Sequence, residues 1–315
     1  MSNPLVSVVM AVYNGQEYLN IAIDSILQQT YDNLELIIID DGSHDNSASI
    51  IYNYSDPRIH YVYQDNRGLA PALNHGIRIA QGDYIARMDC DDISYPTRLA
   101  EQVSFLEKNN NFALVGTSYD LIDWDGRIID RSIHLDLPED LKLEFLVRNP
   151  FGHGTVMIRK TALETTGIYD STQSIEDYEF WWRISQRYPV ANIPKQLYGW
   201  RVNPESISHK GDKSRQFSIT SLMQTIWTHQ SRLAFSKPEI IARFKHYSSI
   251  GDKYKDQYIY FLAALCIALN KRHRRLEAGK LTLILASLPG GWAALKDVKK
   301  HPRSHNYNLV NIGPS

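Results

Sequence analysis

The chain has 315 residues, of which 43% are hydrophobic, and a formal net charge of −1 at pH 7. A chain of this length and composition can bury a full hydrophobic core, and it forms one large domain or two. Its two cysteines, Cys90 and Cys266, exclude a disulfide framework and provide no zinc-site spacing. The first residues contain neither a basic region nor an apolar segment of signal length, so we expect a cytoplasmic location.

The charge is distributed unevenly along the chain. Residues 1–210 hold 17 Lys/Arg and 29 Asp/Glu, a net charge of −12, whereas residues 211–315 hold 17 Lys/Arg and 6 Asp/Glu, a net charge of +11. Two segments with such different charge are expected to have different roles. We therefore predict a main domain over 1–210 and a basic C-terminal extension over 211–315.

The first 92 residues alternate between predicted strands and predicted helices. Apolar runs predict buried strands at 5–12, 34–39 and 84–88, and an alternating pattern predicts another at 58–63. The segments between these strands, several with apolar residues at helical spacing, predict helices at 17–29, 47–54 and 69–80. This alternation is typical of an α/β fold, with a mostly parallel sheet that is flanked by helices.

Polar residues follow three of these strands directly, as Tyr13-Asn14, Asp40-Asp41 and Asp89-Cys90-Asp91. Because ligands of such sheets bind beyond the carboxyl ends of the strands, we expect the three segments to open on one edge. An aromatic ring, a carboxylate that can accept an N–H bond and a pair of acids together predict a nucleotide pocket. The chain has no glycine-rich phosphate loop, so a metal is expected to bind the phosphates.

Three carboxylates lie within four positions at the end of the strand 84–88: Asp89, Asp91 and Asp92. Such groups repel one another and lose solvation, so a positive partner is expected, most simply a divalent cation. On an extended chain Asp89 and Asp91 would point the same way, and Asp92 would point elsewhere. The alternative is an acidic loop before a helix that starts near Thr97, and the Asp-x-Asp pattern alone favours this alternative.

Five segments in order resemble glycosyltransferase family 2, an inverting family with the GT-A fold. The segments are Ser7–Asn14, Asp40–Ser43, Asn66–Leu69, Ala86–Asp92 and Pro96–Leu99. Each motif is weak, but the order and spacing over residues 5–110 make the set specific. The resemblance implies a GT-A catalytic domain over 1–210, with a nucleotide-sugar part at 1–119 and an acceptor part at 120–210.

The resemblance also implies roles for single residues of the donor site. Tyr13 would stack on the nucleotide base, and Asp41 would accept its imide N–H, with Asp40 as a supporting acid. Asp89 would contact the ribose, and Asp91 would coordinate Mn²⁺ or Mg²⁺ on the diphosphate. Other members of the donor site by this resemblance are Ala11, Asn14, Asn66, Arg67 and Cys90, and a further supporting acid is Asp92. Family members often carry Pro at position 11 and Ala, Thr or Ser at position 90.

The segment Ser174–Arg183 resembles the family's Glu-Asp segment at a helix start, which implies that Asp177 is the general base and Glu176 its neighbour. A sugar hydroxyl is a poor nucleophile, so a carboxylate must take its proton as it attacks the anomeric carbon. The alternative is that Ser174 and Asp177 form a helix-capping pattern. Spacing alone favours the cap, and the resemblance favours the base.

Further elements are predicted after the last of these motifs. A strand is predicted at 112–119, a hairpin around Asp125-Gly126, a helix at 138–147 and a strand at 156–159. His153 lies in a segment that resembles the family's acceptor-facing segment, and the alternative is a loop histidine with a structural hydrogen bond. Arg201 lies in a segment that resembles one closing over the diphosphate, which makes it a phosphate partner. Family members often have His at Asn203, and it stays open whether His209 substitutes.

The basic extension is predicted to be helical, over 214–234, 238–247, 253–270 and 276–288. Its apolar run of twelve residues, 258–269, is shorter than the ~18–20 residues that a membrane-spanning helix needs. Two alternatives are open: helices that pack on the catalytic domain, or an interfacial segment attracted to anionic lipid. The second would suit a lipid-linked acceptor.

The resemblance implies an inverting hexosyltransferase that moves a sugar, by default from a UDP-sugar, to a hydroxyl of a glycan in cell-surface polysaccharide or glycan biosynthesis. A nucleic-acid partner is not expected. One alternative is a catalytically inactive carbohydrate-binding or scaffold protein, which predicts the loss of an acid, yet Asp41, Asp89, Asp91 and Asp177 are all present. The other is a sugar-phosphate nucleotidyltransferase. Such an enzyme needs a basic, glycine-rich loop near its N-terminus, and residues 10–20 do not contain one.

Overall fold

The computed structural model describes residues 3–173, 175–202, 222, 236–271 and 275–300. The chain forms two compact units. Unit 1 comprises Met1–Ser132 and Phe151–Gly211, and unit 2 comprises Ile133–Pro150 and Asp212–Ser315. The predicted boundary at 210 assigned residues 133–150 to the first part, whereas in the structure they group with the C-terminal helices. The functional division into donor part, acceptor part and extension stays a prediction.

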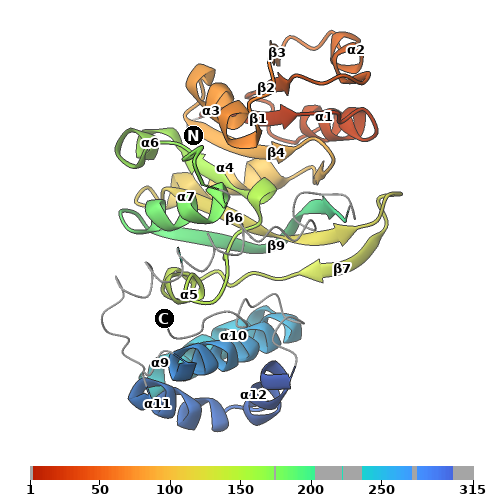
Figure 1. Cartoon of the computed structure of the whole chain (residues 1–315). Helices are drawn as coiled ribbons and strands as arrows, with labels where there is room; N and C mark the ends of the chain where they lie inside the picture. Colours follow the sequence, from red (N-terminus) through yellow and green to blue (C-terminus); the bar gives the residue numbers. More distant parts are fainter. Residues whose placement is uncertain (1–2, 174, 203–221, 223–235, 272–274, 301–315) are drawn as a thin grey trace. The chain divides into compact units, whose positions relative to one another are not determined.

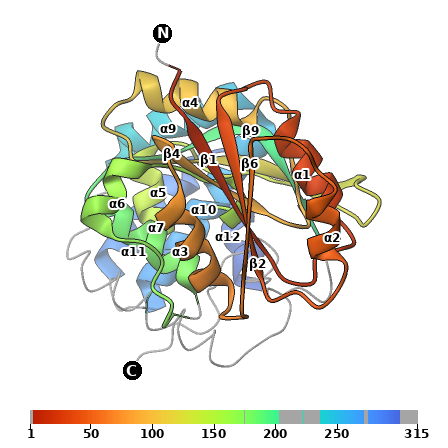
Figure 2. The same cartoon turned by 90° about the horizontal axis from the view of Figure 1, so that it is seen from above.

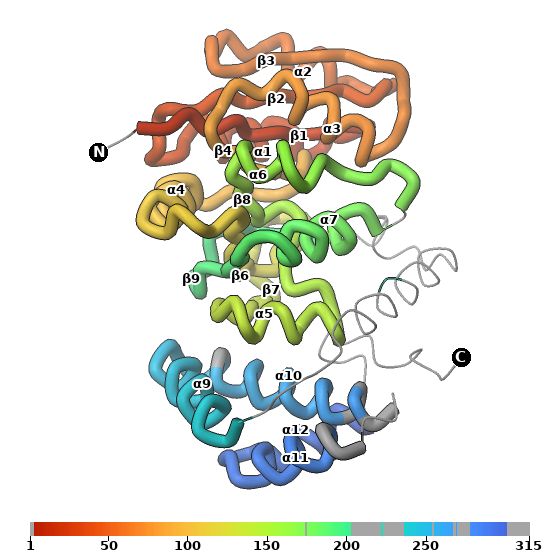
Figure 3. The backbone as a smooth tube through the Cα atoms, turned by 90° about the vertical axis from the view of Figure 1, so that its left-hand side faces the viewer, coloured from red at the N-terminus to blue at the C-terminus, as the bar shows by residue number. Residues whose placement is uncertain are grey.

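Unit 1 is built on one nine-stranded sheet with the order β3-β2-β1-β4-β8-β6-β9-β5, and β7 pairs with β6. The strands are β1 (Val6–Val12), β2 (Leu34–Asp41), β3 (Ile59–Gln64), β4 (Tyr84–Asp89), β5 (Ile93–Ser94), β6 (Leu114–Ile122), β7 (Ile128–Ser132), β8 (Met157–Arg159) and β9 (Val190–Arg201). Strands β1 to β4 pair in parallel, and Figure 3 shows them stacked in the sheet order β3, β2, β1, β4. The predicted parallel α/β sheet is confirmed.

Helices cover both faces of this sheet (Figures 1 and 2). They are α1 (Leu19–Leu27), α2 (Ser47–Tyr52), α3 (Leu69–Ile79), α4 (Arg98–Lys108), α6 (Lys160–Thr166) and α7 (Glu176–Ser185), with the 3₁₀ turn η1 (His153–Thr155). Alternate residues of β1, including Val8 and Met10, are buried in one core with α1 and α4. Val9 points to the other face, where a Cβ on Gly76 of α3 would lie 2.5 Å from it. Glycine at that position therefore allows α3 to approach the sheet closely.

Unit 2 is helical, with α5 (Pro138–Glu144), α9 (Lys237–Ile250), α10 (Asp252–Lys271), α11 (Arg275–Ala286) and α12 (Gly291–Lys300). The centre of the unit is α10, which contacts α9, α11 and α12. Several residues of its apolar run are buried, with Tyr258 and Leu269 at 0% exposure. Both alternatives for the extension, packing on the catalytic domain or on anionic lipid, stay predictions. Among the described residues no helix is both long enough and apolar enough to cross a membrane. All but one residue of the predicted helix 214–234 lies outside the described residues.

Candidate functional site

The polar ends of the first strands meet at one edge of the sheet. The register pairs Ala11 of β1 with Asp89 of β4, and it pairs Val12 with Asp40 of β2. Strands β1, β2 and β4 therefore end side by side at one edge of the sheet. The residues that follow β1 lie between the acids at the ends of β2 and β4. This is the geometry that the strand pattern predicted for a ligand site.

The turn after β1 leaves one aromatic ring open to solvent. Tyr13 is 51% exposed. Asn14 adopts the left-handed conformation with φ 52°, which asparagine tolerates better than most residues. Its backbone N–H donates to Ser43 Oγ at 3.0 Å, and its side-chain oxygen accepts from the His44 N–H at 2.9 Å. The turns after β1 and β2 are thus tied together, and the Tyr13 ring is available for stacking.

Asp41 holds the start of α3 and has one acceptor position left. The carboxylate accepts from Gln64 Nε2 at 2.7 Å, from the Arg67 N–H at 2.9 Å and from the Gly68 N–H at 2.8 Å. A carboxylate offers about four acceptor positions. Two of the three bonds go to Oδ1, so Oδ2 can accept one more N–H. The predicted bond from a base imide N–H to Asp41 stays a prediction, for which this position is available.

Asp40 is fully buried and stabilises the turn. It accepts from the Ser43 N–H at 2.8 Å and from the Tyr61 hydroxyl at 3.0 Å. A Cβ on Gly42 in this turn would lie 2.8 Å from the Asn66 backbone nitrogen, and the glycine has φ 80°. These contacts agree with a supporting role for Asp40 and bring Asn66 next to the turn.

The acid cluster is partly neutralised by protein groups. Asp89 forms an ion pair with the buried guanidinium of Arg87. Asp92 is 1% exposed and accepts from the Arg201 N–H at 2.7 Å. Burial, followed by the charge of Asp89, raises the pKa of Asp91 to about 6 and raises the pKa of Asp92 well above its usual value. Negative charge at this position is therefore unfavourable in the protein alone.

The expectation that the side chains of Asp89 and Asp91 point the same way does not apply to the observed backbone. It assumed an extended chain, but β4 ends at Asp89, and Cys90 and Asp91 form a turn. The period of two therefore does not apply. In the described part of the chain the Asp91 carboxylate has a hydrogen bond only from its own N–H. This leaves most of its acceptor capacity for a ligand.

A divalent cation fits Asp91 only with help from a ligand. The described residues contain no group of three or more His, Cys, Asp or Glu that could hold a metal ion. Carboxylate oxygens are the ligands that Mg²⁺ prefers, and Mg²⁺ is commonly bound through one or two carboxylates plus substrate phosphates. The raised pKa of Asp91 is the electrostatic reason why a cation would be stabilised there.

Arg201 stabilises the turn that carries Asp91. It is 3% exposed, and its Nε donates to the Asp91 carbonyl at 2.7 Å. Its Nη1 donates to the carbonyls of Asp123 and Trp124 in the β6–β7 hairpin, at 2.7 and 2.8 Å. These bonds to backbone carbonyls give Arg201 a positioning role, and its contact with a diphosphate stays a prediction. Asn203 and His209 lie outside the described residues.

A buried tyrosine connects the donor acids with the predicted base. Tyr169 is 5% exposed, and its hydroxyl lies 2.9 Å from His153 Nε2. Burial raises the pKa of Tyr169 well above its usual value, the charge of Arg87 lowers it, and the charges of Asp177, Glu176 and Asp89 raise it. The donor-side acid and the candidate base thus both act electrostatically on this hydroxyl. His153 makes a hydrogen bond to Tyr169, as expected for a loop histidine with a structural role. Its predicted role on the acceptor side stays a prediction.

The first turn of helix α7 carries the candidate base. Its N-cap residue is Ile175, which makes no side-chain capping bond, and the helix starts at Glu176. Ser174 lies outside the described residues. Asp177 and Glu176 thus occupy the first turn and are partly exposed.

Three residues of this site were not indicated by the sequence pattern: Tyr169, Tyr198 and Arg98. The Tyr198 hydroxyl accepts from the Asp89 N–H at 3.2 Å, and the buried Arg98 guanidinium lies over the Tyr198 ring, 5.3 Å from its centre. Arg98 also donates to the carbonyls of Arg87 and Gly154, at 2.9 and 2.6 Å. Arg98 belongs to the Pro96–Leu99 motif, which was the sequence feature that could have indicated it. Through these bonds Arg98 holds β4 in place.

Comparisons with known proteins agree with this geometry. The family model "Glycosyl transferase family 2" matches residues 7–167. EpsE of Bacillus subtilis strain 168, named as a glycosyltransferase, is 37% identical over 217 residues, which cover 66% of this chain and 77% of that protein. The O-antigen biosynthesis glycosyltransferase WbnJ of Escherichia coli is 33% identical over 216 residues, which cover 64% of this chain and 81% of that protein.

Among solved structures, S. aureus TarS 1-349 in complex with UDP-GlcNAc is similar with a TM-score of 0.60 and 16% identity, over 95% of this chain and 91% of that one. At this identity the likeness shows the fold alone, and it confirms the predicted GT-A architecture. The sequence matches and the order of the motifs show the family. The chain belongs to glycosyltransferase family 2.

Proposed function

We propose that the chain is an inverting glycosyltransferase that moves a sugar from a nucleotide-diphosphate sugar to a hydroxyl of a glycan. The observation that carries this proposal is the register of the first strands, which brings the ends of β1, β2 and β4, with Tyr13, Asp41 and Asp89, to one edge of the sheet. The UDP-GlcNAc in the TarS structure supports a UDP-sugar as donor. The O-antigen relative supports a cell-surface polysaccharide as the acceptor class.

Donor binding would use the edge formed by β1, β2 and β4. The exposed Tyr13 ring would stack on the base, and Asp41 Oδ2 would accept the imide N–H of the base. Asp89 would bind the ribose. Ala11, Asn14, Asn66, Arg67 and Cys90 would form the surrounding wall. GDP- and dTDP-sugars are the donors to compare, since pocket shape and not the motif decides the nucleotide.

Asp91 would hold a divalent cation, Mn²⁺ or Mg²⁺, together with phosphate oxygens of the donor. Such a cation, when bound, neutralises negative charge on the leaving diphosphate. The residues around Asp91 would contribute by holding its turn in place. Arg201 fixes the Asp91 carbonyl through its Nε, and Asp92 accepts the Arg201 N–H, so the turn keeps one shape.

Asp177 would act as the general base. It would take the proton of the acceptor hydroxyl while the hydroxyl oxygen attacks the anomeric carbon from the face opposite the nucleotide. The bond from that carbon to the diphosphate oxygen breaks, and the diphosphate leaves. Glu176 and His153, which lie around the same tyrosine, would orient the base and the acceptor.

Release of the nucleoside diphosphate from a panel of UDP-, GDP- and dTDP-sugars with glycan acceptors tests this function. Asp177→Asn should lower kcat at least ~100-fold and leave the donor KM unchanged, because base catalysis contributes about 10²–10⁴. Glu164→Gln, an exposed acid on α6, is the matched control and should retain full activity. If Asp177→Asn transfers sugar at the native rate, Asp177 is not the base.

For the basic extension we propose electrostatic attraction to an anionic membrane surface rather than insertion. Tyr258 and Leu269 of α10 are buried, so we assign the attraction to the net charge of +11 on residues 211–315. The protein should sediment with vesicles that contain anionic lipid and should be released by high salt. Neutral vesicles are the control. Equal recovery in the supernatant with both kinds of vesicle at low salt would contradict this proposal.

A further inference from the structure

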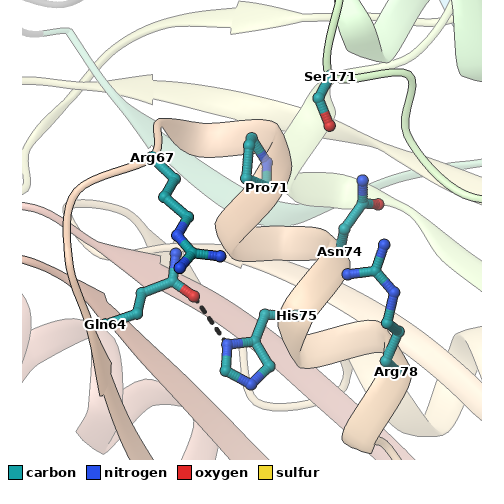
Figure 4. A pocket seen from close by; sticks show the side chains of 7 residues that line it. All are labelled: Gln64, Arg67, Pro71, Asn74, His75, Arg78 and Ser171. Carbon is teal, nitrogen blue, oxygen red and sulfur yellow. Dashed lines mark hydrogen bonds between the residues drawn. The ribbon is translucent and has the colours of Figure 1, made fainter.

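A cavity of about 270 Å³ runs along one side of α3 (Figure 4). Two arginines flank it, Arg67 just before the helix and Arg78 near its end. His75 and Arg78 are three positions apart on α3, so both lie on the same side of the helix. Ser171, from the segment before α7, forms the opposite wall.

The lining of this cavity is positive although its surroundings are acidic. None of its lining residues carries a carboxylate. Among the described ion pairs of the chain neither Arg67 nor Arg78 has a part. Residues 1–210 together carry a net charge of −12. In an acidic domain, two guanidinium groups that border one cavity without acidic partners are suited to an anionic ligand.

The histidine of the cavity is held by a chain of hydrogen bonds. Gln64 Nε2 donates to Asp41 Oδ1 at 2.7 Å, which directs Gln64 Oε1 toward the cavity side. That oxygen lies 2.7 Å from His75 Nδ1, and Figure 4 marks this contact with a dashed line. Since an amide oxygen only accepts, Nδ1 is the donor. Nε2 of the singly protonated ring is then an acceptor, which suits a hydroxyl of the ligand and not the oxyanion itself.

The opposite wall is also fixed. Asn74, 3% exposed, donates to the Tyr169 carbonyl at 2.8 Å and accepts from the Tyr169 N–H at 3.0 Å. This pair of bonds holds the segment that leads to Ser171 against α3. The cavity is thus bordered by two elements that are bonded to each other.

We propose that this cavity binds an oxyanion, a phosphate or carboxylate group that is either free in solution or carried by a sugar. Guanidinium groups match phosphate and carboxylate oxygens with paired N–H donors. The Ser171 hydroxyl and the His75 ring add polar groups on the two walls. The volume exceeds that of one water, about 30 Å³, several times, so the anionic group can enter with part of its carrier. Arg67 also belongs to the proposed wall of the donor site, so Arg78 is the residue that distinguishes the two sites. The inference does not rest on the proposed transfer reaction.

Titration of the metal-free protein with inorganic phosphate, followed by NMR or calorimetry, tests the site. Binding should be saturable, and Arg78→Gln should weaken it about tenfold or more, as expected for the loss of one charge-assisted pair. Arg78 is exposed, so the variant should fold, and circular dichroism checks this. Lys108→Gln, which removes one charge from the exposed end of α4, should leave the affinity unchanged.

Two further measurements decide where the ion binds and what carries it. Phosphate binding that Asp91→Asn abolishes and Arg78→Gln leaves intact would place the ion in the donor site and overturn the proposal. Glucose 1-phosphate and glucuronate, titrated in parallel, distinguish a sugar-borne phosphate and a carboxylate from the free ion. Any of the three that binds saturably and is weakened by Arg78→Gln supports the site. If none binds at millimolar concentrations, the proposal is wrong.

Discussion

The carboxylates of the site differ in what the protein gives each of them. Asp41 receives three donors and Asp92 receives the Arg201 N–H, whereas Asp91 in the described structure has only its own N–H. A carboxylate with donors is fixed in place, and one without them is available to a cation or a ligand. This difference, and not the Asp-x-Asp spacing, is the structural reason to assign the metal to Asp91.

A buried histidine in unit 2 predicts how stability depends on pH. Burial, followed by the charge of Arg148, lowers the pKa of His134 to about 3, below the ~6.5 of an unfolded chain. The unfolded state binds more protons between these values, so stability falls as the pH drops below about 6.5. The slope from this residue is about 1.4 kcal/mol per pH unit.

Urea unfolding of the native chain and of His134→Gln, measured from about pH 7.5 to 5, isolates this contribution. The variant is needed because the raised pKa values of Asp140 and Glu144, about 6 and 7, favour the folded state as the pH falls. The free energy of unfolding of the native chain minus that of His134→Gln should become smaller as the pH falls. A difference that is constant with pH would show that His134 can be protonated in the folded protein.

Elements with a strong apolar pattern could be predicted from the sequence, and elements made by tertiary contacts could not. The strands β1, β2 and β4 were predicted within a few residues because they are continuous apolar runs. The twelve-residue strand β9 was missed, since Pro194 and Lys195 interrupt its pattern and its pairing with β6 shifts register. The motifs indicated Asp41, Asp89 and Asp91, but no local pattern shows that Tyr169 lies beside His153.

The packing of η1 against β9 predicts a strict need for glycine. A Cβ on Gly154 would overlap the Tyr198 hydroxyl and lie 3.0 Å from Asp89 Oδ2. Gly154→Ala should therefore destabilise the protein by about 1–3 kcal/mol in urea unfolding and weaken donor binding. Gly279→Ala on α11, where a Cβ meets nothing within 4 Å, is the control and should stabilise by about 0.5–1 kcal/mol. Equal stabilities of the two variants would refute the close contact.

At the scale of the whole chain, the two units differ in fold and in charge. Unit 1 contains every described residue of the candidate site, and the family model ends within it, at residue 167. Unit 2 has its own buried core around α10 and most of the basic charge. The family could be predicted because its motifs lie at strand ends. The donor, the acceptor and the linkage could not, because pocket shape, which the motifs do not encode, decides them.

The most direct test of the central claim is thermal stabilisation by UDP, GDP and dTDP, each with and without Mn²⁺, of the native chain and of Asp91→Asn. One diphosphate should raise the melting temperature of the native chain only when Mn²⁺ is present, and the variant should lose this shift. Stabilisation that is equal with and without metal, or equal in both proteins, would contradict a metal site at Asp91. No shift with any nucleotide would contradict the nucleotide-sugar site itself.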